Sequence, residues 1–324
     1  MTAPHVSVVV PTYNRANYLA QTLDSILAQT FQDFEIIIAD DGSTDNTAEV
    51  VRAYDNARIH YHLLEHGGLP AALNQGLRAA RGKYIGRIDS DDVWLPTLLA
   101  ELVPVLENDA RLGIVYARAQ GMDANSEPLT QLLGLPERFP GETLKSLVYG
   151  DFITPIALVI SSQAIAQAGG YDESLHGNED WDLWLRIARN YGVAYVPRVL
   201  ARYRYHAQGL THAGSERMMR VMQDRVRVLD KFFTQPNLPE NVLSIKDIAY
   251  RNVNLDWMVR ALQAKQLRVA YNAFRRAQTS SPRPIALLVR AIGLACFTLY
   301  LSKTSWGVRL TESIVAQRRK ALAA

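Results

Sequence analysis

Three carboxylates lie within four positions of the sequence, where IDSDDVWLP (88–96) follows the half-apolar segment KYIGRID. At a separation of about 4 Å, two carboxylates such as Asp89 and Asp91 would repel each other by roughly 4 kcal/mol at an effective dielectric constant near 20. Asp92, the third member, adds to this repulsion. A cluster this tight therefore indicates a site at which solvent, a basic partner or a cation compensates the negative charge.

Other polar residues follow the predicted strands at comparable points. Tyr13 comes after VSVVVPT and Asp41 after FEIIIAD, just as Asp89 comes after KYIGRI. Each of the first two motifs can also be explained as turn and helix-cap chemistry alone, with Asn14 and either Asp45 or Ser43 as the capping residues. That explanation is weaker for all three motifs together, because they recur at successive strand ends.

The elements that would position these residues alternate along residues 1–120. Short β-branched runs are followed by segments of helical period, as in VSVVVPT before NYLAQTLDSILAQT, and FEIIIADD before a helix that begins near Thr44. This alternation predicts an α/β fold with a mostly parallel sheet and helices on both of its faces. Ligands of such sheets bind beyond the carboxyl ends of the strands. The acidic motifs are therefore expected to share one crevice.

The pattern changes along the chain and predicts two domains. Residues 1–212 form the expected catalytic domain, with a nucleotide-binding half over 1–112 and an acceptor half over 113–212. In the acceptor half, GIVYARAQ, TPIALVIS and VAYVPRVLARYRYH read as strands, and NEDWDLWLRIARNYG reads as a helix. Residues 213–324 form a helical extension that carries no strand signal.

Four motifs in order, VSVVVPTYNR, FEIIIADDGSTD, GKYIGRIDSDDVWLP and NEDWDLWLR, resemble those of the inverting family-2 glycosyltransferases. The resemblance covers roughly residues 5–210. It implies the GT-A fold, which is a Rossmann-like, mostly parallel sheet flanked by helices. It also implies transfer of a sugar from a nucleotide-diphosphate donor, preferably a UDP-sugar, to a hydroxyl acceptor with inversion. No P-loop and no G-x-G-x-x-G motif after a strand competes with this interpretation.

By this resemblance, Pro11, Tyr13 and Asp41 line the nucleobase pocket, with Tyr13 stacking on the base and Asp41 accepting from a pyrimidine N–H. A carboxylate acceptor and an aromatic platform suit a uracil-type base. Asp89 and Asp91 resemble the D-x-D pair of the family, with Asp89 near the ribose and Asp91 as the main metal ligand. The cofactor expected there is Mn²⁺ or Mg²⁺, bound through one or two carboxylates and diphosphate oxygens. Outside this set, Asp92 is expected to cap a helix that begins near residue 96.

The second acidic motif supplies the chemistry of transfer. Asp180 resembles the general base that takes the proton of the acceptor hydroxyl, and Glu179 resembles a residue that orients the acceptor. The alternative is that both only open a helix, where acidic residues favour the helix dipole. Asn74 is expected near the nucleoside, although Leu73 replaces the arginine that many relatives carry before it. His206 is expected near the diphosphate, with a purely structural histidine as the alternative.

Composition limits the partners. A chain of 324 residues with 48% hydrophobic residues and a formal net charge of +3 is an ordinary folded protein and does not look like a nucleic-acid binder. Its single cysteine, Cys296, rules out an internal disulfide and fits a reducing compartment. The N-terminus resembles no secretory signal, so we expect a cytoplasmic protein.

The tail carries a second clue to location. PIALLVRAIGLACFTLYL (284–301) is apolar, includes Arg290 and is followed by cations that include RRK (318–320). This pattern fits docking on the anionic inner face of the plasma membrane, as a lipid-linked acceptor would require. The alternative is packing on the catalytic domain or on a second subunit, which would make a homo-oligomer.

Transfer to a growing glycan of the bacterial surface is the leading hypothesis for function. A nucleotide-sugar-binding or membrane-docking protein without turnover is an alternative, as is a metal-dependent nucleotidyltransferase, which also uses paired carboxylates. The sequence does not identify the sugar, the acceptor or the linkage.

Overall fold

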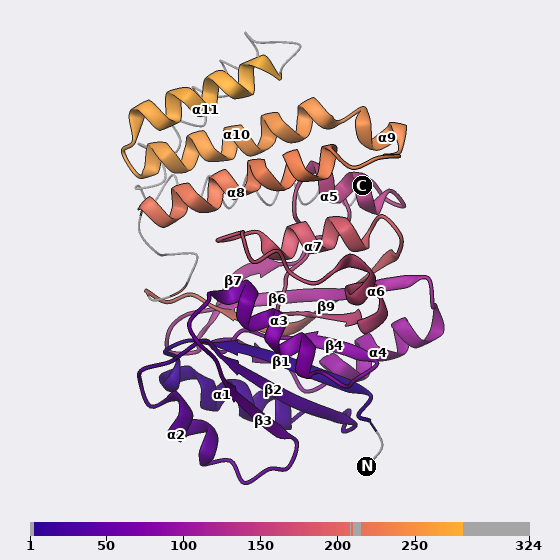
Figure 1. Ribbon diagram of the computed structural model, residues 1–324, viewed down its shortest axis with the longest axis vertical. Coiled ribbons are helices and arrows are strands. Elements are labelled where there is room, and N and C mark those ends of the chain that lie inside the picture. The colour runs from indigo at the N-terminus through magenta and orange to yellow at the C-terminus, as the bar shows by residue number, and fades with distance from the viewer. Residues whose placement is uncertain (1–2, 208, 210–214, 281–324) are drawn as a thin grey trace. The chain divides into compact units, whose positions relative to one another are not determined.

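The chain divides into two compact units, residues 1–213 and 214–324. The computed structural model describes residues 3–207, 209 and 215–280 (Figure 1). The predicted apolar tail from residue 284 onward lies outside the described residues.

The first unit contains the site and is built on one sheet. Its described strands are ordered β3-β2-β1-β4-β8-β6-β9-β5, and β7 pairs with β6 at the side of this path. The strands and their bounds are β1 (Val6–Thr12), β2 (Phe34–Asp40), β3 (Ile59–Leu63), β4 (Tyr84–Arg87), β5 (Val93–Trp94), β6 (Leu112–Met122), β7 (Pro128–Leu133), β8 (Leu158–Ser161) and β9 (Gly192–Arg204).

Most of the strands run in one direction. β1 pairs in parallel with β2 and β4, and β2 pairs in parallel with β3. β8 lies antiparallel between β4 and β6, which restores the common direction in β6 and its parallel neighbour β9. Strands β5 and β7 are antiparallel to their partners. The predicted mostly parallel sheet is therefore confirmed.

Helices lie on both faces of this sheet, as the alternating sequence pattern predicts. Those of the first unit are α1 (Ala16–Leu27), α2 (Thr47–Arg52), α3 (Leu69–Ala79), α4 (Leu98–Asn108), α5 (Thr143–Tyr149), α6 (Ser162–Ala168) and α7 (Glu179–Ile187). Every residue of β1 and β2 is buried. Val8 and Val10 belong to a core cluster that includes residues of α1 and α4. Val9 points to the opposite face, where a Cβ added at Gly76 of α3 would lie 2.4 Å from it.

The segment after β4 is fixed by a tryptophan. Trp94 of β5 is buried, and its indole Nε1 donates to the carbonyl of Ile156 at 2.6 Å. Its ring lies so close to β4 that a Cβ added at Gly86 would meet it at 2.7 Å. The acidic turn between these two strands is therefore held at both of its ends.

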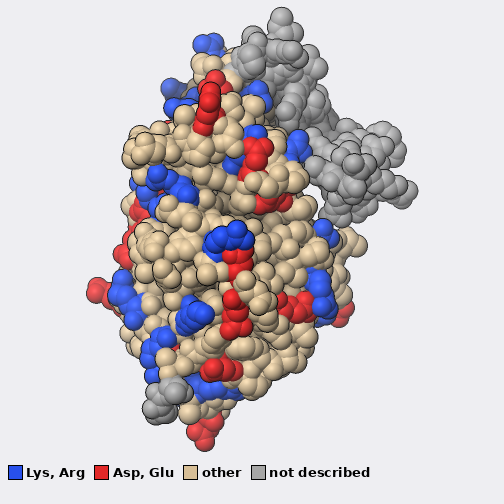
Figure 2. Space-filling view, turned by 90° about the vertical axis from the view of Figure 1, so that its right-hand side faces the viewer, with Lys and Arg blue, Asp and Glu red and all other residues tan. Residues whose placement is uncertain are grey.

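The second unit is helical in its described part, with α8 (Ser215–Phe233), α9 (Glu240–Leu243), α10 (Lys246–Gln263) and α11 (Leu267–Thr279). Its core joins α8, α10 and α11 around Met222, Trp257 and Met258, with small residues such as Ala261 and Ala273 at the contacts. None of the described helices is long and apolar enough to cross a membrane. Figure 2 shows acidic and basic side chains interspersed on the face that it draws.

Candidate active site

The strand-end motifs meet at one edge of the sheet. β2, β1 and β4 are neighbours and parallel, so their carboxyl ends lie side by side. Tyr13, Asp41 and Asp89 follow these three ends. A hydrogen bond of 3.0 Å from Arg15 Nε to Asp91 Oδ2 joins the loop after β1 to the loop after β4.

Asp41 holds the loop before α3. Its carboxylate is almost buried and accepts from the backbone N–H groups of Gly67 (2.7 Å) and Gly68 (3.0 and 3.1 Å). The ring of His66 brings Nδ1 to 2.9 Å from Asp41 Oδ2 and stacks on Tyr13 with the ring centroids 4.6 Å apart. Tyr13 is 42% exposed. An aromatic platform and a carboxylate therefore lie together, with His66 between them.

Pro11 lies deeper than these residues. It is buried in β1, paired with Ala39 of β2, two positions before Tyr13. A proline at this position has a fixed φ and donates no backbone hydrogen bond.

The two turns also carry the cap chemistry that the sequence left as an alternative. Asn14, at φ +52°, accepts through Oδ1 from the N–H groups of Thr44 (2.8 Å) and Asp45 (3.3 Å). Asp45 in turn accepts from the N–H groups of Ala16 (3.1 Å) and Thr47 (3.0 Å), the first residues of α1 and α2. Burial raises the pKa of Asp45, but these hydrogen bonds outweigh it and the pKa is lowered.

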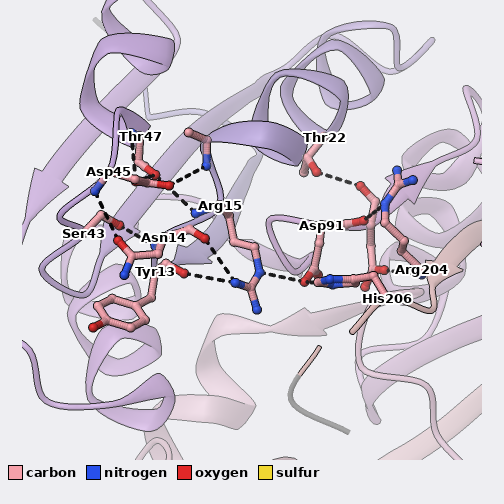
Figure 3. A network of polar contacts seen from close by, with 12 residues as sticks. Tyr13, Asn14, Arg15, Thr22, Ser43, Asp45, Thr47, Asp91, Arg204 and His206 are labelled. Carbon is pink, nitrogen blue, oxygen red and sulfur yellow. Dashed lines mark hydrogen bonds and ion pairs between the residues drawn. The ribbon is translucent and has the colours of Figure 1, made fainter. Parts of the chain in front are cut away.

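Asp91 faces two basic side chains, as Figure 3 shows. Besides Arg15, His206 lies against Asp91 Oδ2, with its Nε2 at 2.9 Å. The His206 ring is 4% exposed and meets the Tyr18 ring edge-on at 4.8 Å. Arg204, at the end of β9, donates from Nε to the Asp91 carbonyl at 2.7 Å. The structure thus brings His206 to the D-x-D motif, 115 positions away in the sequence.

The expected helix cap at Asp92 is wrong. Helix α4 begins at Leu98, and its N-cap residue, Thr97, makes no side-chain cap. The two residues of β5 intervene, and Asp92 is buried beneath the turn, where Oδ1 accepts from the backbone N–H of Arg204 at 2.8 Å. Burial, together with the charges of Asp91 and Asp89, raises its pKa well above the usual range.

The second acidic motif meets the first through a buried arginine. Arg87, the last residue of β4, is 3% exposed, and its Nη2 lies 3.4 Å from Asp89 Oδ1 and 3.7 Å from Glu179 Oε1. Glu179 and Asp180 begin α7. Burial raises the pKa of Asp89, and Asp91 adds to that rise while Arg87 opposes it. Asp180 is partly exposed and accepts from the N–H of Trp181 at 2.7 Å.

The charged form of Glu179 is disfavoured. Burial and the neighbouring charge of Asp180 raise its pKa to about 7, against the opposing effect of Arg87. A carboxyl group in such an environment keeps its proton to a higher pH than an exposed one does.

Glu179→Gln is expected to change how stability depends on pH. In the unfolded chain Glu179 ionises near its ordinary pKa of 4.5, and in the fold near 7. The stability that protonated Glu179 contributes to the fold is fully present below pH 4.5 and is lost as the pH rises through 7. Gln has no proton to lose, so the melting temperature of the variant should gain on that of the parent from about pH 4.5 to 8. Thermal unfolding over this range measures the gap. A difference in melting temperature that does not change with pH contradicts the raised pKa of Glu179. Glu49→Gln, at an exposed position of α2, is the control.

Asn74 bonds to the loop after α6. Its Nδ2 donates to the Tyr171 carbonyl (2.9 Å) and to Glu173 Oε1 (2.8 Å), while its Oδ1 accepts from the Tyr171 N–H at 2.9 Å. The side chain joins α3 to the loop after α6, so it is not among the residues gathered around Asp91. Leu73 beside it is buried.

No group of three or more His, Cys, Asp or Glu within the described part of the chain is arranged to hold a metal ion by itself. The donor chemistry nevertheless fits a hard cation that shares its shell with a ligand. Asp91 and Asp89 lie in one turn, and carboxylate oxygens are the ligands that Mg²⁺ and Mn²⁺ take together with phosphate oxygens. Binding of such a cation would compete with Arg15 and His206 for Asp91 Oδ2.

Sequence reasoning found the acids of this site and missed its cations. Arg15, Arg87 and His66 contact the carboxylates above, and Arg204 donates from Nε to the backbone carbonyl of Asp91. One signal was readable, because Arg87 is a charged residue within a strand that is otherwise apolar. Such a residue is buried only when it is paired.

The fold and this edge define an α/β protein whose ligand site lies beyond the carboxyl ends of parallel strands. The model of the family described as glycosyl transferase family 2 matches residues 7–157. An uncharacterized glycosyltransferase of Rickettsia prowazekii is 33% identical over 219 residues, which is 65% of this chain and 67% of the relative. The chain belongs to glycosyltransferase family 2.

Two solved structures share the fold of this chain. S. aureus TarS (residues 1–349), in complex with UDP-GlcNAc, superposes with a TM-score of 0.66 at 20% identity, over 91% of this chain and 89% of that one. The mannosyltransferase PcManGT of Pyrobaculum calidifontis, in complex with GDP-Man and Mn²⁺, gives a TM-score of 0.60 at 23% identity, over 97% and 87%. The GT-A fold expected from the sequence is confirmed.

Proposed function

We propose that the protein transfers a sugar from a nucleotide-diphosphate donor, preferably a UDP-sugar, to a hydroxyl acceptor with inversion. The observation that carries the proposal is a pair of acidic sites joined by one arginine. Asp89 and Asp91 lie at the strand ends, Glu179 and Asp180 begin α7, and Arg87 reaches from the first pair to the second. A donor site and a general base beside it are what a single displacement requires.

The base pocket is assigned to Tyr13, Asp41 and Pro11. A carboxylate offers about four lone-pair positions. The N–H groups of Gly67 and Gly68 and the His66 ring already contact both oxygens of Asp41, so a pyrimidine N–H would take the place of the His66 ring at Oδ2. The stack of His66 on Tyr13 would open or shift to admit the base. A uracil-type base is therefore favoured.

Asp41→Asn is expected to weaken binding of uridine and UDP on the order of tenfold, both with and without metal, because the charged acceptor is lost. Titration calorimetry with uridine, with and without Mn²⁺, measures this. Asp33→Asn, at the start of the same βα unit, is the control and should bind as the parent does. Equal affinity for uridine in Asp41→Asn and parent removes Asp41 from the base pocket.

The diphosphate is assigned to the turn at Asp91, with Asp89 toward the ribose and His206 and Arg15 as basic neighbours. A bound Mn²⁺ or Mg²⁺ would be held by Asp91, with Asp89 as a second ligand. It would supply positive charge to the leaving diphosphate. With Asp91 bound to such a cation, His206 and Arg15 would be available to bond phosphate oxygens.

The transfer step is assigned to α7. Asp180 takes the proton of the acceptor hydroxyl. At the same time the hydroxyl oxygen bonds to the anomeric carbon, and the bond from that carbon to the diphosphate oxygen breaks. Glu179, with its pKa raised to about 7, is available in its protonated form to orient the acceptor by a hydrogen bond. Attack on the face opposite the leaving group inverts the anomeric centre.

A nucleotide-sugar screen tests the proposal. A bound donor stabilises the fold by RT ln(1 + [L]/Kd), so melting temperatures with Mn²⁺ should rise for one class of donor, with UDP-sugars first and GDP-sugars as the comparison. Release of nucleoside diphosphate should then depend on acceptor and metal. Binding without any turnover supports a sugar-binding protein instead, and release of pyrophosphate from a nucleoside triphosphate supports nucleotidyl transfer. The family match favours neither alternative.

The acceptor is assigned as a glycan or lipid-linked glycan of the bacterial surface, reached from the cytoplasmic side of the membrane. Charge supports this location. Residues 215–324 contain 19 Lys or Arg and 7 Asp or Glu, whereas residues 1–214 contain 16 and 25. An excess of cations in the C-terminal unit suits an anionic leaflet. Self-association of this unit into a homo-oligomer is the competing assignment.

Deletion of residues 284–324 is expected to reduce sedimentation with vesicles of phosphatidylcholine and phosphatidylglycerol, because the apolar run and its cations are removed together. Replacement of Arg318, Arg319 and Lys320 by Gln should reduce it less and remove most of its salt dependence. Sedimentation of the parent with neutral vesicles is the control. Equal sedimentation of truncated and full-length protein contradicts docking through the tail, and a fall in oligomeric state instead supports self-association.

A further inference from the structure

We propose that Arg87 is a positioning residue of the transfer reaction, one that sets the distance between the donor-side Asp89 and the acceptor-side Glu179. The inference rests on the proposed function of this site and goes beyond it, because it assigns the alignment of the two substrates to a residue of the sheet. It requires no contact between Arg87 and the reacting atoms.

The first support is that one nitrogen serves both sides. Arg87 Nη2 lies 3.4 Å from Asp89 Oδ1 and 3.7 Å from Glu179 Oε1. Asp89 belongs to the turn after β4, whereas Glu179 is the first residue of α7, 90 positions later. Both separations fall within ion-pair range, so movement of either acid away from Arg87 removes one of the two pairs. The start of α7 is thereby tied to the strand end that the donor would occupy.

The second support is that the fold does not use the whole guanidinium. Arg87 is 3% exposed, yet its Nε and Nη1 have no hydrogen-bond partner among the described residues. Buried N–H groups are nearly always bonded, so an arginine retained for stability alone would have its donors satisfied. The guanidinium carbon Cζ of Arg87 lies 5.7 Å from the centroid of the Tyr171 ring, which limits the movement of the guanidinium.

The alternative is that Arg87 only balances charge. Asp89, Glu179 and Asp180 all favour its charged form. Any cation at this place would meet that need, whereas positioning needs Nη2 at a fixed point, which the rigid planar guanidinium over the Tyr171 ring provides. Lysine is a point charge on a flexible stem, so Arg87→Lys separates the two roles.

Kinetics with the identified donor provide the first test. Arg87→Lys should lower kcat by roughly 10- to 10²-fold while the donor KM stays near that of the parent, because misalignment affects the transfer step rather than donor binding. In a Glu179→Gln background, Arg87→Lys should lower kcat little further, since the partner through which Arg87 acts is already altered. Parental kcat in Arg87→Lys, or an equal loss in both backgrounds, overturns the proposal.

The control is Arg186→Lys. Arg186 is a partly buried arginine of the same helix that pairs with Asp182 at 2.7 Å and bonds the carbonyls of Ala168 and Gly170. Its replacement should lower the melting temperature and leave kcat near that of the parent. Equal loss of kcat in both lysine variants would show that any weakened contact of α7 suffices, and would overturn a special role for Arg87.

A structural test keeps the inference separate from the proposed function. Crystal structures of the parent and of Arg87→Gln should differ in the separation of Asp89 from Glu179, with the start of α7 displaced in the variant. An unchanged separation overturns the inference even if the enzyme transfers sugar. If the parent transfers none, the proposed function fails and the displacement still decides whether Arg87 sets this distance.

Discussion

Asp180→Asn is expected to lower the rate of sugar transfer by roughly 10²-fold or more while leaving donor affinity near that of the parent. The amide keeps the size of the side chain and can still accept from the N–H of Trp181. It cannot take a proton from the acceptor hydroxyl. Initial rates and calorimetric donor affinity, measured on the same preparation, give the two quantities.

Asp182→Asn is the matched control for this experiment. Asp182 lies two residues further along α7, where its carboxylate is buried and pairs with Arg186. Its loss should lower the melting temperature and spare turnover, whereas Asp180→Asn should do the reverse. If Asp180 only began the helix, Asn would serve nearly as well at that place, and near-parental turnover would remove Asp180 from the mechanism.

Asp91→Asn is expected to abolish the effect of Mn²⁺ on nucleoside-diphosphate binding, weakening it on the order of 10²-fold in the presence of metal. The charged oxygen that now meets Arg15 and His206 would be replaced by a neutral amide, which is a poor ligand for a hard cation. Calorimetry with UDP and GDP, in Mn²⁺ and in a chelator, measures the metal-dependent part.

Asp123→Asn tests whether loss of negative charge alone has this effect. The Asp123 carboxylate accepts from the N–H groups of Asn125 and Glu127 in the turn between β6 and β7, so its role is local. Metal dependence should survive in this variant. An undiminished response to Mn²⁺ in Asp91→Asn would show that Asp91 is not a metal ligand.

The parts of the fold that the sequence predicts are those with a strong period. The alternation of strands and helices up to Asp89 was readable because β1 and β2 are long apolar runs and α1 is amphipathic over three turns. Strand β5 and helix α6 were not foreseen, since they contain two and seven residues and are too short to show a period. The missed β5 also explains the error at Asp92, which lies just before it.

The site was predictable where residue type alone indicates chemistry. Clustered carboxylates indicate a site because they repel one another, and Asp91 and Glu179 lie in such clusters. Asn74 has no such signal, and the structure gives its amide to the loop after α6. Arg15 and Arg204 were hidden because an isolated arginine in a sequence looks like a surface residue, whereas the place of Arg87 in an apolar strand was a readable signal of its burial.

The pairing of Asp91 with His206 has a consequence for the order of folding. The two residues are separated by 115 positions, and Arg204 meets Asp92 across 112. Contacts at such a separation form late, because closing a long loop costs chain entropy before any contact repays it. During synthesis from the N-terminus, β1 to β4 leave the ribosome well before β9. The acidic turn therefore lacks Arg204 and His206 until β9 and the residues after it are made, and an incomplete chain has no finished site.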